Sequence, residues 1–250
     1  MVERPASDAA PVMTFFVPCL NEENNIGPTL ETLAEVADDL GLRSEILVFD
    51  DASTDETAAR VREFADREAA RGPRVAVRLF ENSRTMGLGF NYVEGAFQGR
   101  GTYYMLVNGD HAESRDALVA ILEHRGEADM IVPFFDERDV RGWRRRAISR
   151  TFTGIVNRVS GFRLRYYNGP VLHRRELVMR WHPDSQGYAY QAELVTTLLR
   201  LGTTVREVQI ANQDRESGVS KAFTIQNVLS VGHSLLQIAL RRLRAWLFHR

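Results

Sequence analysis

The sequence predicts an α/β protein with a mostly parallel sheet flanked by helices, and three observations lead to this prediction. Short apolar runs alternate with segments of helical periodicity along most of the chain, which is typical of βαβ units. Many of these runs are continuously apolar, as expected of parallel strands buried on both faces. Several end in polar residues, and right-handed crossovers place successive strand ends along one edge of such a sheet.

The expected elements follow from apolar runs, helical spacing and turn residues. Strands are predicted at residues 12–18, 45–49, 74–80, 101–107, 129–134, 166–173 and 203–210. Helices are predicted at residues 26–40, 54–71, 90–98, 114–126, 188–201 and 225–250. Ser53 and Glu56 have the spacing of a capping box for the second helix, and Ser114 is expected to cap the fourth. The strand at 166–173 is expected to be interrupted at Asn168-Gly169-Pro170.

The composition is that of one large globular domain, with 250 residues, 44% hydrophobic content and a formal net charge of −1. The balanced charge argues against a protein that mainly coats nucleic acid. Cys19 is the single cysteine, which excludes an internal disulfide and fits a reducing cytosol. The first ten residues lack the apolar core of a signal peptide, and no run reaches about 18 apolar residues. We therefore expect a soluble or peripheral protein.

The stretch that organises the chain is the apolar run from Gly101, which stops at the polar corner Asn108-Gly109-Asp110. In open α/β sheets, ligands bind beyond the carboxyl ends of the strands. Asp110 and the amide oxygen of Asn108 are therefore placed where a phosphate-bound divalent cation is held, since Mg²⁺ takes oxygen ligands. The alternative is a simple turn made by the same residues.

Other strand ends are equally polar: Asn21-Glu22, Asp50-Asp51 and the segment from Asn82 to Gly89. One acidic strand end can be a helix cap, which is the alternative for Asp51. Several on one edge favour a nucleotide site, in which carboxylates accept ribose or base donors and glycines admit the phosphates. The dinucleotide fingerprint G-x-G-x-x-G and a P-loop lysine are both absent from the sequence.

The second half of the sequence is rich in groups that bind anions. Six arginines lie between Arg138 and Arg150, and they indicate either an anionic acceptor or a solvated basic surface. Arg215 and Lys221 flank Gly218 in a charged loop that would clamp a diphosphate or simply lie on the surface. The long helix from Ile225 is amphipathic, with arginines expected opposite its apolar stripe. That stripe suits a membrane interface, the protein core or a second subunit.

Six short motifs occur in order between Pro18 and Lys221. They are residues 18–24 (PCLNEEN), 50–57 (DDASTDET), Asn82 with 87–89 (GLG), 108–110 (NGD), 168–177 (NGPVLHRREL) and 215–221 (RESGVSK). Together they resemble the motifs of family-two glycosyltransferases of the GT-A fold, and in particular the polyprenyl (dolichol) phosphate mannose synthases. The resemblance implies one GT-A domain over 1–250, with a loose terminus at 1–11, a nucleotide-binding half at 12–133, an acceptor-binding half at 134–221 and an amphipathic helix at 222–250.

The resemblance also implies roles for individual residues. Nucleotide contacts are implied at Pro18, Asn21, Glu22, Asp50, Asp51, Gly87, Asn108 and Asp110. Acceptor phosphate binding is implied at Arg138, Arg145 and Ser149, and catalysis at Asp110, Arg215 and Lys221. Mg²⁺ or Mn²⁺ would bind Asp110 and Asn108. Because Asn108 replaces the usual aspartate, one charge is lost and we expect weaker metal binding. Ala112 also departs from the glutamine frequent in the synthases.

The expected activity is inverting transfer of a sugar from a nucleoside diphosphate to a polyprenyl phosphate. A phosphate acceptor needs no general base, since its second pKa of about 6 leaves it ionised at neutral pH. One alternative is transfer to a hydroxyl of a glycan or small molecule, with Glu193 or another acid outside these motifs as the base. Another is a sugar-nucleotide binding protein without activity. The expected location is the cytoplasm, at the inner face of the cell membrane, with peripheral membrane contact, a homodimer as an option and no nucleic-acid partner.

Overall fold

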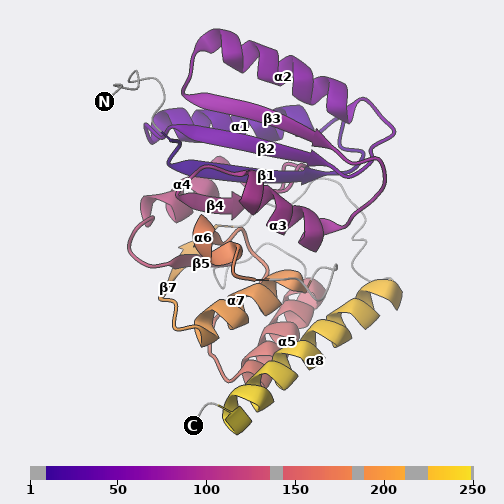
Figure 1. The fold of residues 1–250 in the computed structure, drawn as a ribbon, viewed down its shortest axis with the longest axis vertical. Helices are drawn as coiled ribbons and strands as arrows, with labels where there is room; N and C mark the ends of the chain where they lie inside the picture. The colour runs from indigo at the N-terminus through magenta and orange to yellow at the C-terminus, as the bar shows by residue number, and fades with distance from the viewer. Residues whose placement is uncertain (1–9, 136–142, 182–188, 212–224, 249–250) are drawn as a thin grey trace.

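The computed structural model describes residues 10–135, 143–181, 189–211 and 225–248, with the backbone alone for 143–145 and 225–229. Within these residues one seven-stranded sheet has the order β3-β2-β1-β4-β6-β5-β7 (Figure 1). Its strands are β1 (Met13–Cys19), β2 (Ser44–Asp50), β3 (Val75–Glu81), β4 (Tyr103–Leu106), β5 (Met130–Phe135), β6 (Leu172–Arg174) and β7 (Val205–Ile210). All neighbouring pairs are parallel except those of β6, so the predicted mostly parallel α/β fold is confirmed.

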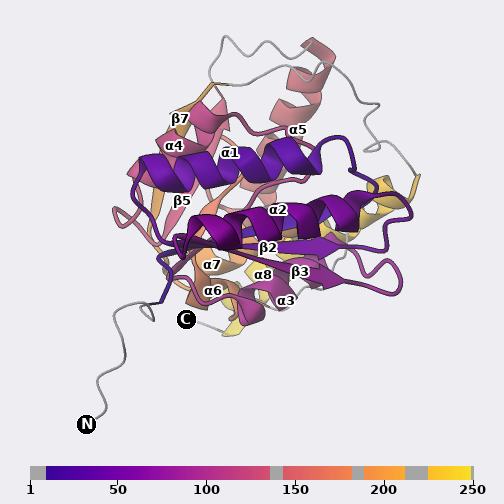
Figure 2. The same cartoon turned by 90° about the horizontal axis from the view of Figure 1, so that it is seen from above.

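Helices cover both faces of the sheet. They are α1 (Ile26–Asp39), α2 (Thr57–Arg71), α3 (Leu88–Gln98), α4 (Arg115–Glu123), α5 (Trp143–Ser160), α6 (Arg175–Val178), α7 (Tyr190–Arg200) and α8 (Ile225–Phe248). Figure 2 shows α1 and α2 on one side of β2 and β3, with α3 on the other side. Over the described ranges, the structure contains no helix with both the length and the hydrophobicity to cross a membrane.

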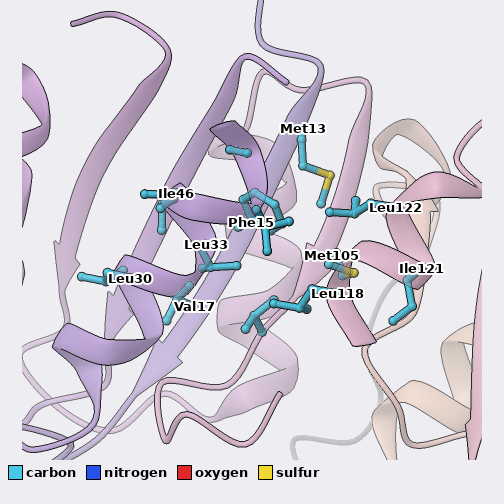
Figure 3. Close-up of a cluster of buried hydrophobic side chains, with 14 of the residues drawn as sticks. Met13, Phe15, Val17, Leu30, Leu33, Ile46, Met105, Leu118, Ile121 and Leu122 are labelled. Carbon is cyan, nitrogen blue, oxygen red and sulfur yellow. The ribbon is translucent and has the colours of Figure 1, made fainter. Parts of the chain in front are cut away.

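The two faces of β1 explain the two hydrophobic cores. Side chains alternate along a strand, so Phe15 and its neighbours Met13 and Val17 pack with α1 and α4 (Figure 3). Phe16 points to the opposite face, where its ring lies 5.5 Å from that of Tyr92 on α3. Both core layers are fully buried, and they hold β1 in the centre of the sheet.

Strand β6 is shorter than the predicted strand at 166–173, and that prediction is wrong in extent. The backbone turns at Gly169, whose carbonyl accepts a hydrogen bond from Val171 N at 2.8 Å. A Cβ at Gly169 would lie 2.7 Å from Pro133 Cγ, so glycine is required for this close approach. The three remaining residues pair antiparallel with both β4 and β5.

Helix α2 begins at Thr57, three residues later than predicted. The predicted capping box does not form, because the Ser53 hydroxyl accepts a hydrogen bond from Asn21 N at 2.9 Å instead. Asp55 accepts from Thr57 N at 3.0 Å and satisfies part of the helix terminus. The polar residues after β2 therefore tie the loops of the sheet edge together. The predicted cap of α4 is confirmed, since Ser114 Oγ accepts from Ala117 N at 3.2 Å.

Candidate active site

The ends of the first strands are level with one another. Cys19, Asp50 and Glu81 are partners in the register of β1, β2 and β3. Across the described residues, the non-glycine residues with positive φ are Asn21 (56°), Ala52 (71°) and His111 (54°). Each follows the carboxyl end of β1, β2 or β4. Such backbone strain costs of order 1 kcal/mol per residue and concentrates at functional sites, so we take this rim as the candidate site.

The loops after β1 and β2 bind each other through the predicted nucleotide-binding residues. Asn21 Oδ1 accepts a hydrogen bond from Thr54 N at 2.8 Å, and Asp50 Oδ1 accepts from Ser53 N at 2.8 Å. Glu22 N donates to the Thr57 hydroxyl at 2.8 Å. The bonds of Asn21 and Glu22 join the two loops, and the bond of Asp50 lies within the loop after β2. Together they fix the backbone of both loops.

Asp51 is the centre of a second network. Its Oδ1 accepts hydrogen bonds from Met86 N at 2.8 Å, Asn82 Nδ2 at 2.8 Å and Asn91 Nδ2 at 2.9 Å, and its Oδ2 accepts from Gly87 N at 3.1 Å. Partial burial raises the pKa of Asp51, but the four hydrogen bonds outweigh it and leave this pKa below its usual value. A carboxylate offers about four acceptor positions, so Asp51 is occupied in shaping the loop that precedes α3.

The corner after β4 packs directly on the end of β1. Gly109 N donates to Pro18 O at 3.1 Å, and the Thr29 hydroxyl donates to Gly109 O at 3.2 Å. A Cβ at Gly109 would lie 3.0 Å from both Pro18 O and Cys19 Cβ. Glycine therefore lets the corner approach β1 closely, and the structure brings the predicted residues Pro18 and Asp110 into one part of the rim.

Glu113 is a site residue that sequence reasoning missed. Its Oε1 accepts a hydrogen bond from Asn108 Nδ2 at 2.8 Å, and its Oε2 accepts from Asn108 N at 3.2 Å. Burial raises the pKa of Glu113 to about 7, although the bonds from Asn108 act in the opposite direction. In the sequence, Glu113 stands directly before Ser114. Ser114 is the predicted helix cap, and nothing in the local pattern gives Glu113 a separate role.

The corner suits a cation that arrives with a phosphate ligand. In the described part of the chain no group of three or more His, Cys, Asp or Glu side chains is placed to hold a metal. The Asn108 amide nitrogen is bound to Glu113, which leaves its Oδ1 as the atom to act as a ligand. One carboxylate, one amide oxygen and substrate phosphates form an acceptable donor set for Mg²⁺, so Asp110 and Asn108 fit such an ion.

The predicted residues of the second half are only partly described. Arg138, Arg215 and Lys221 lie outside the described residues, as does the side chain of Arg145. Ser149 lies partly buried on α5. Glu193, the base of the hydroxyl alternative, is fully buried on α7 and bound by Arg241 at 2.8 Å. A general base must come within hydrogen-bonding distance of its substrate, and Glu193 is not accessible for this role.

A mostly parallel sheet whose polar strand ends gather at one rim is what the GT-A fold of glycosyltransferases requires, and solved structures confirm the predicted GT-A fold. Glucosyl-3-phosphoglycerate synthase from Mycobacterium tuberculosis, in complex with uridine diphosphate, has a TM-score of 0.66 at 18% identity, and the match covers 94% of this chain and 82% of that protein. The same protein in complex with Mn²⁺ and UDP-glucose has a TM-score of 0.65 at 18% identity, and the match covers 95% of this chain and 80% of that protein.

The family is established by sequence. The model of glycosyl transferase family 2 matches residues 14–183, so the chain belongs to this family. Dodecaprenyl-phosphate galacturonate synthase of Rhizobium johnstonii is 25% identical over 213 residues, with 84% of this chain and 61% of that protein covered. Polyprenol monophosphomannose synthase of Mycolicibacterium smegmatis is 31% identical over 193 residues, with 70% and 69% covered. The chain spans less than two thirds of the Rhizobium protein. The family match and these relatives confirm the resemblance to polyprenyl-phosphate glycosyltransferases of family two that the motifs indicated.

Proposed function

We propose that the protein is an inverting glycosyltransferase that moves a sugar from a nucleoside diphosphate to a polyprenyl phosphate. The observation that carries this proposal is the rim itself, where the ends of β1, β2 and β4 are joined by hydrogen bonds at Pro18, Asp51 and Gly109. This is where an α/β sheet binds a nucleotide. The curated relatives are named as polyprenyl-phosphate sugar synthases, which supports the choice of acceptor.

In this proposal the donor lies along the rim with its diphosphate at the Asn108–Asp110 corner. Asn21, Glu22 and Asp50 contact the nucleoside, and Asp51 acts indirectly by holding the loop at Gly87 against the donor. Asp110 and Asn108 Oδ1 hold Mg²⁺ or Mn²⁺, and Glu113 orients Asn108 by binding its amide nitrogen. The ion, when bound, offsets the negative charge of the departing diphosphate.

The acceptor side relies on cations rather than on a base. An oxygen of the acceptor phosphate forms the new bond to the anomeric carbon as the bond from that carbon to the nucleoside diphosphate breaks, which inverts the centre. The phosphate is already ionised at neutral pH, and Glu193, the base named for a hydroxyl acceptor, is buried. We propose that Arg138, Arg145 and Ser149 bind the acceptor phosphate and that Arg215 and Lys221 stabilise the departing diphosphate. Such an acceptor implies peripheral contact with the inner face of the membrane.

The acceptor class is tested by incubating the protein with labelled nucleoside diphosphate sugars and a short polyprenyl phosphate in detergent. We expect a lipid-phosphate-linked sugar with the polyprenyl phosphate and no product with the free polyprenol or with soluble glycans. Transfer to a hydroxyl with none to the phosphate would contradict the proposal. Binding of donors, seen as a higher melting temperature, without transfer to any acceptor would instead favour a binding protein.

The role of the corner is tested by Asp110→Ala. Loss of one electrostatic group at a departing anion costs about 100-fold or more in turnover, so we expect at least this loss with an unchanged melting temperature. The matched control is Asp116→Ala, since Asp116 is an exposed carboxylate on the neighbouring helix α4 with 89% of its side chain accessible. Equal turnover of the two variants would remove Asp110 from the site.

A further inference from the structure

Helix α8 is attached to the protein through its arginine-bearing side. Arg241 donates to Glu193 Oε1 of α7 at 2.8 Å, and Arg242 donates to the carbonyl oxygen of Arg158 on α5 at 2.8 Å. Ser234 and Ile238, which lie on the same side of the helix, are buried. Arg241 and Arg242 thus lie opposite the leucine stripe of α8, as expected from the sequence, and the side that carries these two arginines is the one that packs on the protein.

The opposite side of α8 presents leucines to solvent. Leu236, Leu240, Leu243 and Leu247 recur at alternating spacings of four and three residues, which at about 100° per residue places them on one narrow face. Their exposed fractions are 56%, 47%, 50% and 53%. The helix ends in Trp246 and Phe248, exposed by 64% and 73%. Large apolar side chains exposed together in this way mark a contact surface.

Helices α5 and α8 lie side by side at the end of the molecule opposite α2 (Figure 1), and they share one charge pattern. Neither helix contains an aspartate or a glutamate. Their arginines are Arg144, Arg145, Arg146, Arg150, Arg158, Arg241, Arg242 and Arg244. This concentration contrasts with the net charge of −1 for the whole chain. Helix α5 also exposes Ile148 and Ile155.

We propose that the exposed leucine face of α8, together with α5, docks on an anionic lipid bilayer. Leucines and the terminal Trp246 would enter the interface. The exposed Arg244 of α8 and the exposed Arg150 and Arg158 of α5 would bind lipid headgroups. This inference rests on the proposed function in one respect, since a polyprenyl acceptor is presented at a membrane. It goes beyond that function in naming the surface, and it is measured without any acceptor.

A second copy of the chain fits this face less well than a membrane. A twofold contact would pack each helix against its own copy. The exposed Arg244 of α8 and the exposed Arg150 and Arg158 of α5 would then come together from both copies with no carboxylate on α5 or α8 to pair with them, and like charges that face each other oppose association. An anionic bilayer supplies the missing negative charge and accepts the apolar side chains at the same time.

The test is cosedimentation of the full chain with vesicles of phosphatidylcholine, with or without about one third phosphatidylglycerol and without polyprenyl phosphate. We expect binding that is markedly tighter to the anionic vesicles. The double variant Leu240→Gln, Leu243→Gln should bind at least about tenfold more weakly, because two leucines no longer enter the interface. Arg244→Gln should lose about fivefold. Phe97→Gln, which changes an exposed apolar residue of α3, is the matched control and should bind as the unaltered protein does.

Transfer to an acceptor dispersed in detergent separates this inference from the proposed function. The double variant should keep full transfer there and lose transfer to acceptor in vesicles. Vesicle binding in the absence of any transfer would contradict the proposed function and would still support the docking surface. The docking proposal is overturned if the unaltered protein ignores anionic vesicles or if the double variant binds them equally well. A stable dimer that the double variant converts to a monomer, without vesicle binding, would assign the face to a second copy.

Discussion

Replacing Asp51 with alanine is expected to lower the free energy of unfolding by about 3 kcal/mol. Each partly buried donor left without an acceptor costs about 1–3 kcal/mol. Asp51 accepts from four donors, two of them backbone amides at Met86 and Gly87 that have no freedom to turn toward water. The amide of Asn82 is partly buried and also donates to Asn91 Oδ1 at 3.0 Å, so it keeps one acceptor and the expected loss is smaller than the sum of four. Urea unfolding at neutral pH measures it.

Asp51→Asn separates hydrogen bonding from charge. An asparagine oxygen can replace Asp51 Oδ1, which accepts three of the four bonds, but its NH₂ group would then face the N–H of Gly87. We expect a loss of about 1–2 kcal/mol, between the unaltered protein and the alanine variant. Asp116→Ala serves as the control and should stay within about 0.5 kcal/mol. An alanine variant as stable as this control would show that Asp51 does not hold the loop.

Hydrophobic patterning sufficed for the strands that lie at the centre of the fold. The continuous apolar runs that contain Phe15 and Ile46 lie within β1 and β2, because a strand covered on both faces has few other ways to bury such residues. The predicted start of α2 was wrong because Ser53 and Asp55 are both able to cap a helix. The Ser53 hydroxyl is instead used by Asn21 N from another loop, and a contact over this distance in sequence leaves no local pattern.

The candidate site was predictable to the extent that it depends on strand ends. Asn21, Asp50 and Asp110 could be placed on one edge of the sheet because acids and amides after parallel strands share that edge. Glu113 was missed because its partner Asn108 is recognised only when the corner folds back on itself. The sequence also left open which side of α8 packs on the protein, since Glu193 is an unremarkable helical residue until Arg241 from α8 binds it. In each case the deciding contact joins residues of different segments, and hydrophobic periodicity within one segment does not report such a contact.

His173 gives the protein a pH dependence in stability that a single substitution should reduce. It lies fully buried on β6, in register with Tyr104 and Met130. Neither of its ring nitrogens has a hydrogen-bond partner among the described residues. Burial lowers the pKa of His173 from 6.5 to about 3, because the charged imidazolium would have no solvation in this layer of the core.

Since the pKa of His173 is lower in the folded state than in the unfolded state, the unfolded chain binds the proton first as the pH falls. The stability due to neutral His173 is therefore complete above about pH 6.5 and declines below it by about 1.4 kcal/mol per pH unit. Between about pH 7 and pH 4 this amounts to about 3 kcal/mol. In urea unfolding, His173→Leu should reduce the fall in the free energy of unfolding between about pH 7 and pH 4 by about 3 kcal/mol. This holds whether the substitution raises or lowers the stability at neutral pH. His233→Asn, which changes an exposed histidine of α8 that contacts Gln237, should keep the dependence of the unaltered protein. Equal slopes for the leucine variant and the unaltered protein would mean that His173 gains its proton without unfolding, through a partner or a water that solvates the charge inside the core.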